Sequence, residues 1–144
     1  MKKSVIGIVL AITAALFIAA CGSKTDTGGK VSTGKTIKTV PVGNLTATLS
    51  NDSGQLKRGT QEFMVKFTDA SGKPVDVGAA SLSFHMAQMG SMAAMNDQTS
   101  FTTTETPGVY RGKATIETAG EWAGQLAYEG PAGRGKTTFT VTAQ

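Results

Sequence analysis

Residues 62–74 read Glu-Phe-Met-Val-Lys-Phe-Thr-Asp-Ala-Ser-Gly-Lys-Pro. Every second residue in the first half of this stretch is large and apolar, namely Phe63, Val65 and Phe67. A period of two is typical of a β-strand with one buried face. The second half is made of residues that favour turns, with a glycine for an unusual φ and a proline that stiffens the exit. The stretch therefore predicts a half-buried strand that ends in a tight turn.

The same alternation continues on both sides of this strand and turn. Further apolar sets with this spacing are Leu45, Ala47 and Leu49; Leu82, Phe84 and Met86; Tyr110, Ala114 and Ile116; Trp122, Leu126 and Tyr128; and Phe139 with Val141. A threonine-rich run from Phe101 also favours extended chain. With turn signals between the runs and no convincing helix, we predict an all-β, immunoglobulin-like antiparallel β-sandwich of about seven strands. Trp122 is expected in its core.

The N-terminus has the pattern of a targeting segment. Lys2 and Lys3 precede an apolar run that ends at Ala20, directly before Cys21. This run is too short for a confident membrane span and suits a signal peptide. The residues 18–21, Ile-Ala-Ala-Cys, resemble the lipobox of bacterial lipoproteins, which implies cleavage before Cys21 and lipidation of its sulfur. An ordinary secretory signal with a chance cysteine is the alternative.

These features divide the chain into three parts. Residues 1–20 are predicted to be a lipoprotein signal peptide, 21–43 a flexible Gly/Ser/Thr-rich membrane tether, and 44–144 a single β-sandwich domain. The domain would be extracytoplasmic and lipid-anchored, on the periplasmic side in a Gram-negative cell. Gly22 stands where an aspartate would resemble an inner-membrane retention signal, so the outer membrane is favoured there.

Composition excludes several classes of function. After residue 20 the chain keeps twelve basic and ten acidic residues, and no run of Lys or Arg occurs, so nucleic-acid binding is not supported. Lipidation of Cys21 would leave no free thiol, hence no disulfide and no cysteine nucleophile. With one histidine, no catalytic triad can be assembled and a zinc site lacks ligands. We therefore expect no enzyme activity, and the remaining functions are carrying, buffering, sensing or docking.

Residues 85–95, His-Met-Ala-Gln-Met-Gly-Ser-Met-Ala-Ala-Met, hold the most distinctive chemistry of the chain. Four of its six methionines and its only histidine lie here. Thioethers and imidazole are donors that a soft monovalent ion accepts, so we expect a loop that binds Cu(I), or Ag(I). The candidate ligands are His85, Met86, Met89, Met92 and Met95.

Strand alternation leaves the ligand set open. If the strand continues through His85 and Met86, these two side chains face opposite ways, Met86 packs inward, and only His85, Met89, Met92 and Met95 can converge. If the strand ends at Phe84, all five candidates can converge. Met89 and Met92 are the preferred ligands in either case. Met64 lies on the polar face of its own strand and is expected to be a stray exposed methionine.

Gly54 to Val141 resembles the YtkA-like family of extracytoplasmic bacterial domains. The resemblance is carried by the strand and turn of 63–75, the methionine-rich stretch of 86–92, and the segments 107–110 and 120–122. It implies an immunoglobulin-like sandwich and proximity to metal-transport and efflux components. Many members are lipoproteins. The family often has a compact Met-Pro-x-Met-like element, whereas here no proline follows Met86 and the methionines run further.

Two functions are compatible with these features. One is a membrane-anchored Cu(I) or Ag(I) chaperone or buffer that passes the ion to an efflux or oxidase-assembly protein. The alternative is a docking module that uses the same methionines as an apolar contact surface without metal. A symmetric homodimer could bring two methionine segments together, and the sequence leaves that arrangement open.

Overall fold

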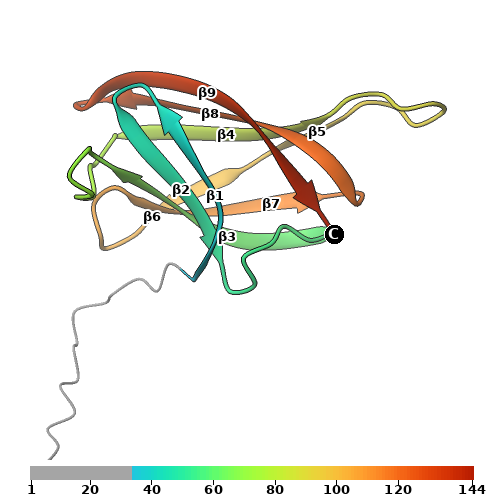
Figure 1. Ribbon diagram of the computed structural model, residues 1–144, viewed down its shortest axis with the longest axis horizontal. Coiled ribbons are helices and arrows are strands. Elements are labelled where there is room, and N and C mark those ends of the chain that lie inside the picture. The colour runs from blue at the N-terminus through green and yellow to red at the C-terminus, as the bar shows by residue number, and fades with distance from the viewer. Residues whose placement is uncertain (1–33) are drawn as a thin grey trace, which may run out of the picture.

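A computed structural model describes residues 34–144, so the expected signal peptide, Cys21 and the first part of the tether lie outside the described residues. The described chain forms nine β-strands in two layers (Figure 1). Within it, no helix is long and apolar enough to cross a membrane. The strands are β1 (Lys35–Val42), β2 (Leu45–Asn51), β3 (Gly59–Thr68), β4 (Ala79–Met86), β5 (Met95–Gln98), β6 (Ser100–Thr103), β7 (Val109–Ile116), β8 (Gly120–Gly130) and β9 (Gly133–Ala143).

The two layers confirm the predicted antiparallel β-sandwich. One sheet has the order β1-β2-β3-β7-β6 and the other the order β5-β4-β8-β9. Without β1 and β5, these orders match the ABED and CFG sheets of a constant-type immunoglobulin domain. The count of nine strands exceeds the expected seven because an additional strand lies at an edge of each sheet.

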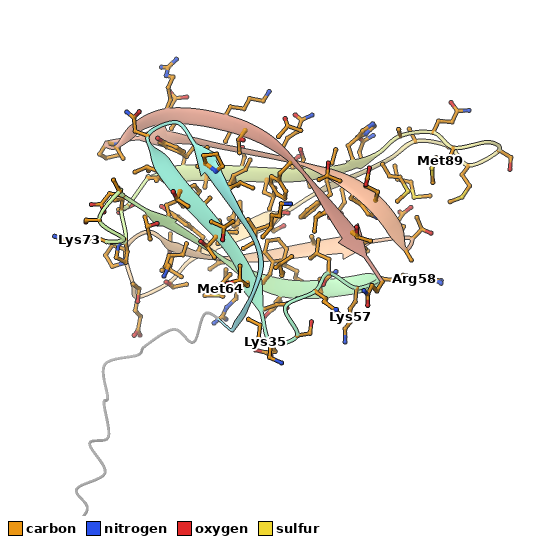
Figure 2. The ribbon with its side chains drawn as sticks, viewed as in Figure 1. Lys35, Lys57, Arg58, Met64, Lys73 and Met89 are labelled. Atoms are coloured by element: carbon orange, nitrogen blue, oxygen red, sulfur yellow. The ribbon has the colours of Figure 1, made fainter. Side chains whose placement is uncertain are left out.

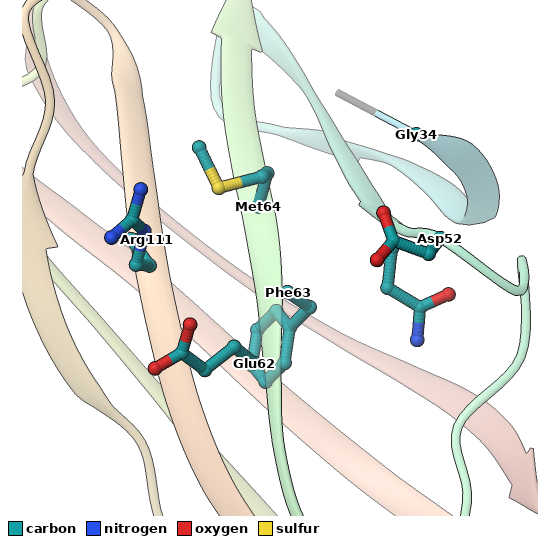
Figure 3. A pocket seen from close by; sticks show the side chains of 7 residues that line it. Gly34, Asp52, Glu62, Phe63, Met64 and Arg111 are labelled. Carbon is teal, nitrogen blue, oxygen red and sulfur yellow. The ribbon is translucent and has the colours of Figure 1, made fainter. Parts of the chain in front are cut away.

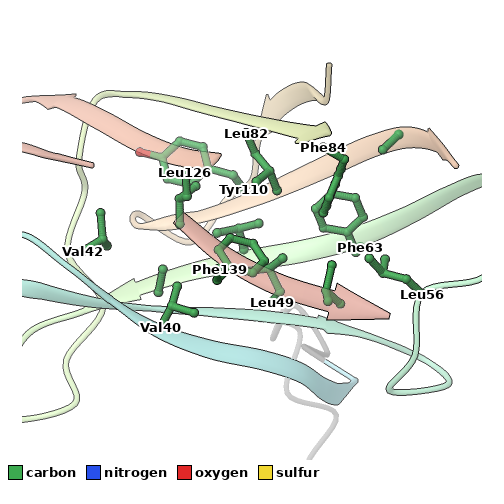
Figure 4. Close-up of a cluster of buried hydrophobic side chains, with 14 of the residues drawn as sticks. Val40, Val42, Leu49, Leu56, Phe63, Leu82, Phe84, Tyr110, Leu126 and Phe139 are labelled. Atoms are coloured by element: carbon green, nitrogen blue, oxygen red, sulfur yellow. The ribbon is translucent and has the colours of Figure 1, made fainter. Parts of the chain in front are cut away.

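The core fills the space between the inner faces of the two sheets (Figure 4). Alternation places Phe63, Val65 and Phe67 in it, all at most 1% exposed, as predicted. Trp122 is also fully buried, which confirms its expected place, and its indole N–H donates to the carbonyl of Thr118 at 3.0 Å. That bond satisfies the one polar atom of the largest core side chain.

The strand β1 corrects the expected domain boundary. Residues 35–42 fall within the expected tether, yet they pair with β2 through a two-residue turn at Gly43 and Asn44. Gly43 has a φ of 58°, which suits such a turn. Val40 and Val42 are buried against the core. The short apolar alternation before a Gly-Asn pair is the signal for a hairpin, and the surrounding polar residues obscure it.

β5 and β6 are two parts of one extended run that changes sheet at Thr99. The Thr99 amide donates to the carbonyl of Leu82 in one sheet, and the next residue begins the pairing with β7 in the other. Asp97 reinforces this crossing, because its carboxylate accepts a hydrogen bond at 2.9 Å from the amide of Thr115 in β7. The base of the β4–β5 hairpin is therefore tied to both sheets.

Candidate metal site

The methionine-rich segment is the tip of a β-hairpin rather than a loop. β4 pairs with β5 so that His85 faces Asn96 and Met86 faces Met95. The same register reaches the tip, where Met89 and Met92 form an isolated antiparallel bridge. The hairpin extends beyond the end of the sandwich (Figure 1), and Met89 lies near its outer end (Figure 2).

A two-residue turn closes the hairpin. The amide of Met92 donates to the carbonyl of Met89 at 2.9 Å, and the amide of Met89 donates back at 3.3 Å. Gly90 begins the turn with a φ of 55°, and Ser91 follows it. Gly-Ser between two extended segments is a recognised hairpin signal, so the sequence contains the information that distinguishes this turn from an open loop.

The hairpin divides the four methionines into two pairs on opposite faces. Met86 and Met89 are three residues apart, an odd number, and side chains alternate along a strand. Met86 is 3% exposed and belongs to the core, and Met95 packs against the core beside it. Met89 and Met92 are 56% and 41% exposed. The four sulfurs are therefore not gathered at one point, although they repeat every third residue.

Met89 and Met92 are the methionines that the hairpin brings together in the open. Residues that exchange both backbone hydrogen bonds have Cα atoms about 5.5 Å apart and side chains on the same face. They are also the exposed large hydrophobic side chains of residues 34–144. Two thioethers in this arrangement are accessible to a soft ion without any change in the fold.

His85 lies on the same side of the hairpin as this pair, nearer to the body of the domain. It stands four residues before Met89, which at roughly 3.3 Å per residue is about 13 Å along the strand. Its ring is half-buried, and Nδ1 lies 2.7 Å from Oδ1 of Asn96. When Nδ1 carries the proton and donates to this amide oxygen, Nε2 keeps its lone pair for a metal.

Asn96 contacts a candidate ligand, but no sequence pattern predicts its role. Its role follows only from the hairpin register, which places it directly opposite His85. Metal-binding histidines usually donate their other ring N–H to a carboxylate, a backbone carbonyl or water, and the Asn96 amide oxygen occupies the position of such an acceptor. The prediction that His85 and Met86 face opposite ways, one of the two alternatives considered, agrees with the burial of Met86.

Met64 is buried, which corrects the expectation that it is exposed. It lies on the outer face of the five-stranded sheet but is only 9% exposed. Arg111 stands opposite it on β7, and both line a surface hollow of about 270 Å³ (Figure 3). Met64 lies on the body of the sandwich, away from Met89 at the hairpin tip (Figure 2).

Harder metals have no comparable site in the described chain. Residues 34–144 hold no group of three or more His, Cys, Asp or Glu side chains placed to bind a metal ion. Two neighbouring thioethers are donors that a soft ion accepts, and they also form an apolar contact surface. It offers no general base next to a nucleophile.

Shifted pKa values occur at the opposite end of β4. Asp76 has a pKa below its usual 3.8, because the Gly78 amide and then the Tyr110 hydroxyl donate to it. Burial, followed by the hydrogen bond to Asp76, raises the pKa of Tyr110. The pKa of Asp69 is lowered chiefly by the Ser71 hydroxyl at 2.6 Å. These groups stabilise the turns after β3 and are remote from the hairpin tip.

Comparison with known proteins identifies the family of the chain. No curated protein matches it, and no solved structure does. The profile of the YtkA-like family matches residues 39–127, which run from β1 through most of β8 and include the whole methionine hairpin. The match covers more than half of the sequence and includes strands of both sheets. The chain therefore belongs to the YtkA-like family.

Proposed function

We propose that this protein is a membrane-anchored, extracytoplasmic carrier or buffer of Cu(I), with Ag(I) as a second soft ion. The observation that carries the proposal is the exposed cross-strand pair of Met89 and Met92 at the hairpin tip. Thioethers are soft donors that bear no proton at ordinary pH, and they form no disulfides in an oxidising compartment. The ion is the cargo of such a protein, not a resident cofactor.

The burial and register of the five expected ligands support a smaller set. The tip pair alone forms the primary site in this proposal. His85, about 13 Å along the strand from Met89, is a separate donor on the same side, oriented by Asn96. Met86 and Met95 support the hairpin from the core side. A site with few donors at an exposed tip would hold its ion loosely enough to hand it to a partner, such as an efflux or oxidase-assembly protein.

The proposed location follows from the N-terminal sequence. Lipidation of Cys21 would hold the domain at the membrane surface, where two or more acyl chains give stable anchoring. A Cys21→Ser variant should then appear in the soluble fraction, and intact-mass measurement of the wild type should show a diacylated cysteine. An unmodified cysteine in membrane-associated protein would contradict the lipoprotein assignment.

Competition for Cu(I) against a chromophoric chelator, without oxygen, tests the metal site. We expect a Met89→Ser/Met92→Ser variant to lose affinity by at least about tenfold, since loss of a ligand should cost no less than loss of a supporting residue. Met64→Leu is the matched control, because it removes a thioether far from the tip and should leave the affinity unchanged. Equal competition by the wild type and the double serine variant would rule out the tip as the site.

A docking function without metal is the second candidate, favoured by the exposure of the same two apolar side chains. Leucine separates the two functions, because it keeps the apolar character and has no sulfur. If the tip carries an ion, Met89→Leu/Met92→Leu should fail to restore copper-dependent oxidase activity or silver tolerance in a deletion strain. Full restoration by the leucine pair would favour docking.

A further inference from the structure

Charged side chains are distributed unequally between the two layers of the sandwich. We define the basic side as the strands of the five-stranded sheet together with the β2–β3 connection. It carries seven basic residues, Lys35, Lys38, Lys57, Arg58, Lys66, Arg111 and Lys113, against the two acidic residues Asp52 and Glu62. The rest of residues 34–144 carries three basic and seven acidic residues. The basic side therefore has a net charge of +5, and the rest of the described residues have a net charge of −4.

The basic side chains are available for a partner. Six of the seven are exposed, and Lys66 is half-buried. In residues 34–144 the one ion pair joins Arg134 to Glu129 at 3.3 Å, and it lies on the other sheet. None of the seven is thus neutralised by a carboxylate contact. Figure 2 shows Lys35 and Lys57 directed away from the sandwich on the side where the described chain begins, and Arg58 directed outward at the end of the sandwich near the C-terminus.

We propose that the basic side docks the folded domain onto the headgroups of an anionic lipid bilayer. Juxtamembrane basic residues each add about fivefold to binding at an anionic surface, which is about 1 kcal/mol expressed as an equilibrium constant. Their attraction acts within a screening length of about 8 Å at physiological salt. The basic side has seven positive charges and two negative charges, so its net attraction to anionic headgroups remains favourable.

The position of Gly34 supports a bilayer as the partner. Gly34 precedes β1 and lines the hollow formed with Asp52, Glu62, Met64 and Arg111 (Figure 3), so the described chain begins on the basic side. If they form the flexible tether expected from the sequence, the twelve residues between Cys21 and Gly34 span roughly 20 Å. This step rests on the proposed lipid anchor, whereas the charge distribution does not.

Docking in this orientation leaves the hairpin tip accessible. β4 and β5 belong to the four-stranded sheet, which would face away from the bilayer. Met89 and Met92 would then lie at a constant distance from the bilayer. On a free tether, this distance would vary. The domain would rest on the lipid surface.

Amine acetylation of the full-length protein in lipid vesicles, read by mass spectrometry, tests the proposal. The vesicles are phosphatidylcholine alone or mixed with phosphatidylglycerol. We expect Lys35, Lys57 and Lys113 to react at least about fivefold more slowly on the anionic vesicles. Lys73 and Lys136 should react equally on both. The protection should disappear at about 1 M salt, where the screening length falls to about 3 Å.

A pair of variants with equal charge change provides the control. Lys57→Glu/Arg58→Glu should abolish most of the protection of Lys35 and Lys113, and Lys73→Glu/Lys136→Glu should preserve it. Equal protection of all lysines, or the same pattern on neutral vesicles, would overturn the proposal. Cu(I) affinity is measured without vesicles and should be unchanged in both variants, so a failure of lipid docking is distinguishable from a failure of the metal site.

Discussion

Tyr110 connects the core to the turn that precedes β4. Its ring packs edge-on against Phe67, with centroids 5.8 Å apart, and its hydroxyl donates to Asp76 at 3.0 Å and to the Gly78 carbonyl at 3.2 Å. A buried hydroxyl needs such partners, and an ionised carboxylate is a stronger acceptor than a neutral one. This single side chain therefore joins hydrophobic packing to the positioning of a turn.

Tyr110→Phe should lower the free energy of unfolding by about 1 kcal/mol at neutral pH, because the ring stays and the hydrogen bonds are lost. Asp69 and Asp76 have folded-state pKa values below 3.8. Their contribution to stability is therefore present above that pH and is lost as the pH falls through the folded values. The difference between wild type and variant should shrink at pH 3, in urea titrations followed by Trp122 fluorescence. An equal difference at pH 3 and pH 7 would contradict the role of Asp76.

At the scale of elements, the hairpins at the two sheet edges have the same kind of turn but different roles. Each has a two-residue turn that begins with a glycine of positive φ, Gly43 in one and Gly90 in the other. The β1–β2 hairpin packs against the core at its turn end, where Val40 and Val42 are buried. The β4–β5 hairpin leaves the core after Met86, so its tip is free to act as a site.

The contribution of β1 to the fold can be tested by stability. Val42→Ala should lower the free energy of unfolding by about 2 kcal/mol, since a fully buried valine side chain contributes about 1.5–3 kcal/mol. Thr39→Ala, at an exposed position of the same strand, should change it by no more than about 0.5 kcal/mol. Urea unfolding measures both. A value for Val42→Ala as small as that for Thr39→Ala would mean that β1 is dispensable, as a tether would be.

On the scale of the whole molecule, one core holds both sheets. The buried cluster draws side chains from β1, β2, β3, β4, β7, β8 and β9, and the β2–β3 connection adds Leu56, which is fully buried. The C-terminus closes the same end, because the amide of Arg58 donates to the carbonyl of Gln144 at 2.8 Å. A single cluster of this kind predicts cooperative unfolding of the domain.

Leu49→Ala in one sheet and Leu126→Ala in the other should each lower the free energy of unfolding by about 2–5 kcal/mol. Both leucines are fully buried. Both variants should keep one transition that is coincident by far-UV circular dichroism and by Trp122 fluorescence. Separate transitions for the two probes would contradict a common core.

The sequence alone determined the fold class, because alternation with a period of two depends only on the order of apolar residues along the chain. Phe63, Val65, Phe67 and Trp122 could be placed inside for this reason, and the family resemblance followed from short local motifs. The preference for Met89 and Met92 also came from the sequence, and these two side chains are the exposed pair. Whether they bind an ion remains a prediction.

Only the tertiary structure decided which methionines meet. A repeat of three residues is compatible with convergence on one point or with division between two faces, and the register of β4 with β5 selected the division. Pairing with β2 likewise drew residues 35–42 into the sandwich despite their polar composition. Register and edge pairing depend on contacts between residues distant in sequence, so local patterns could not decide them.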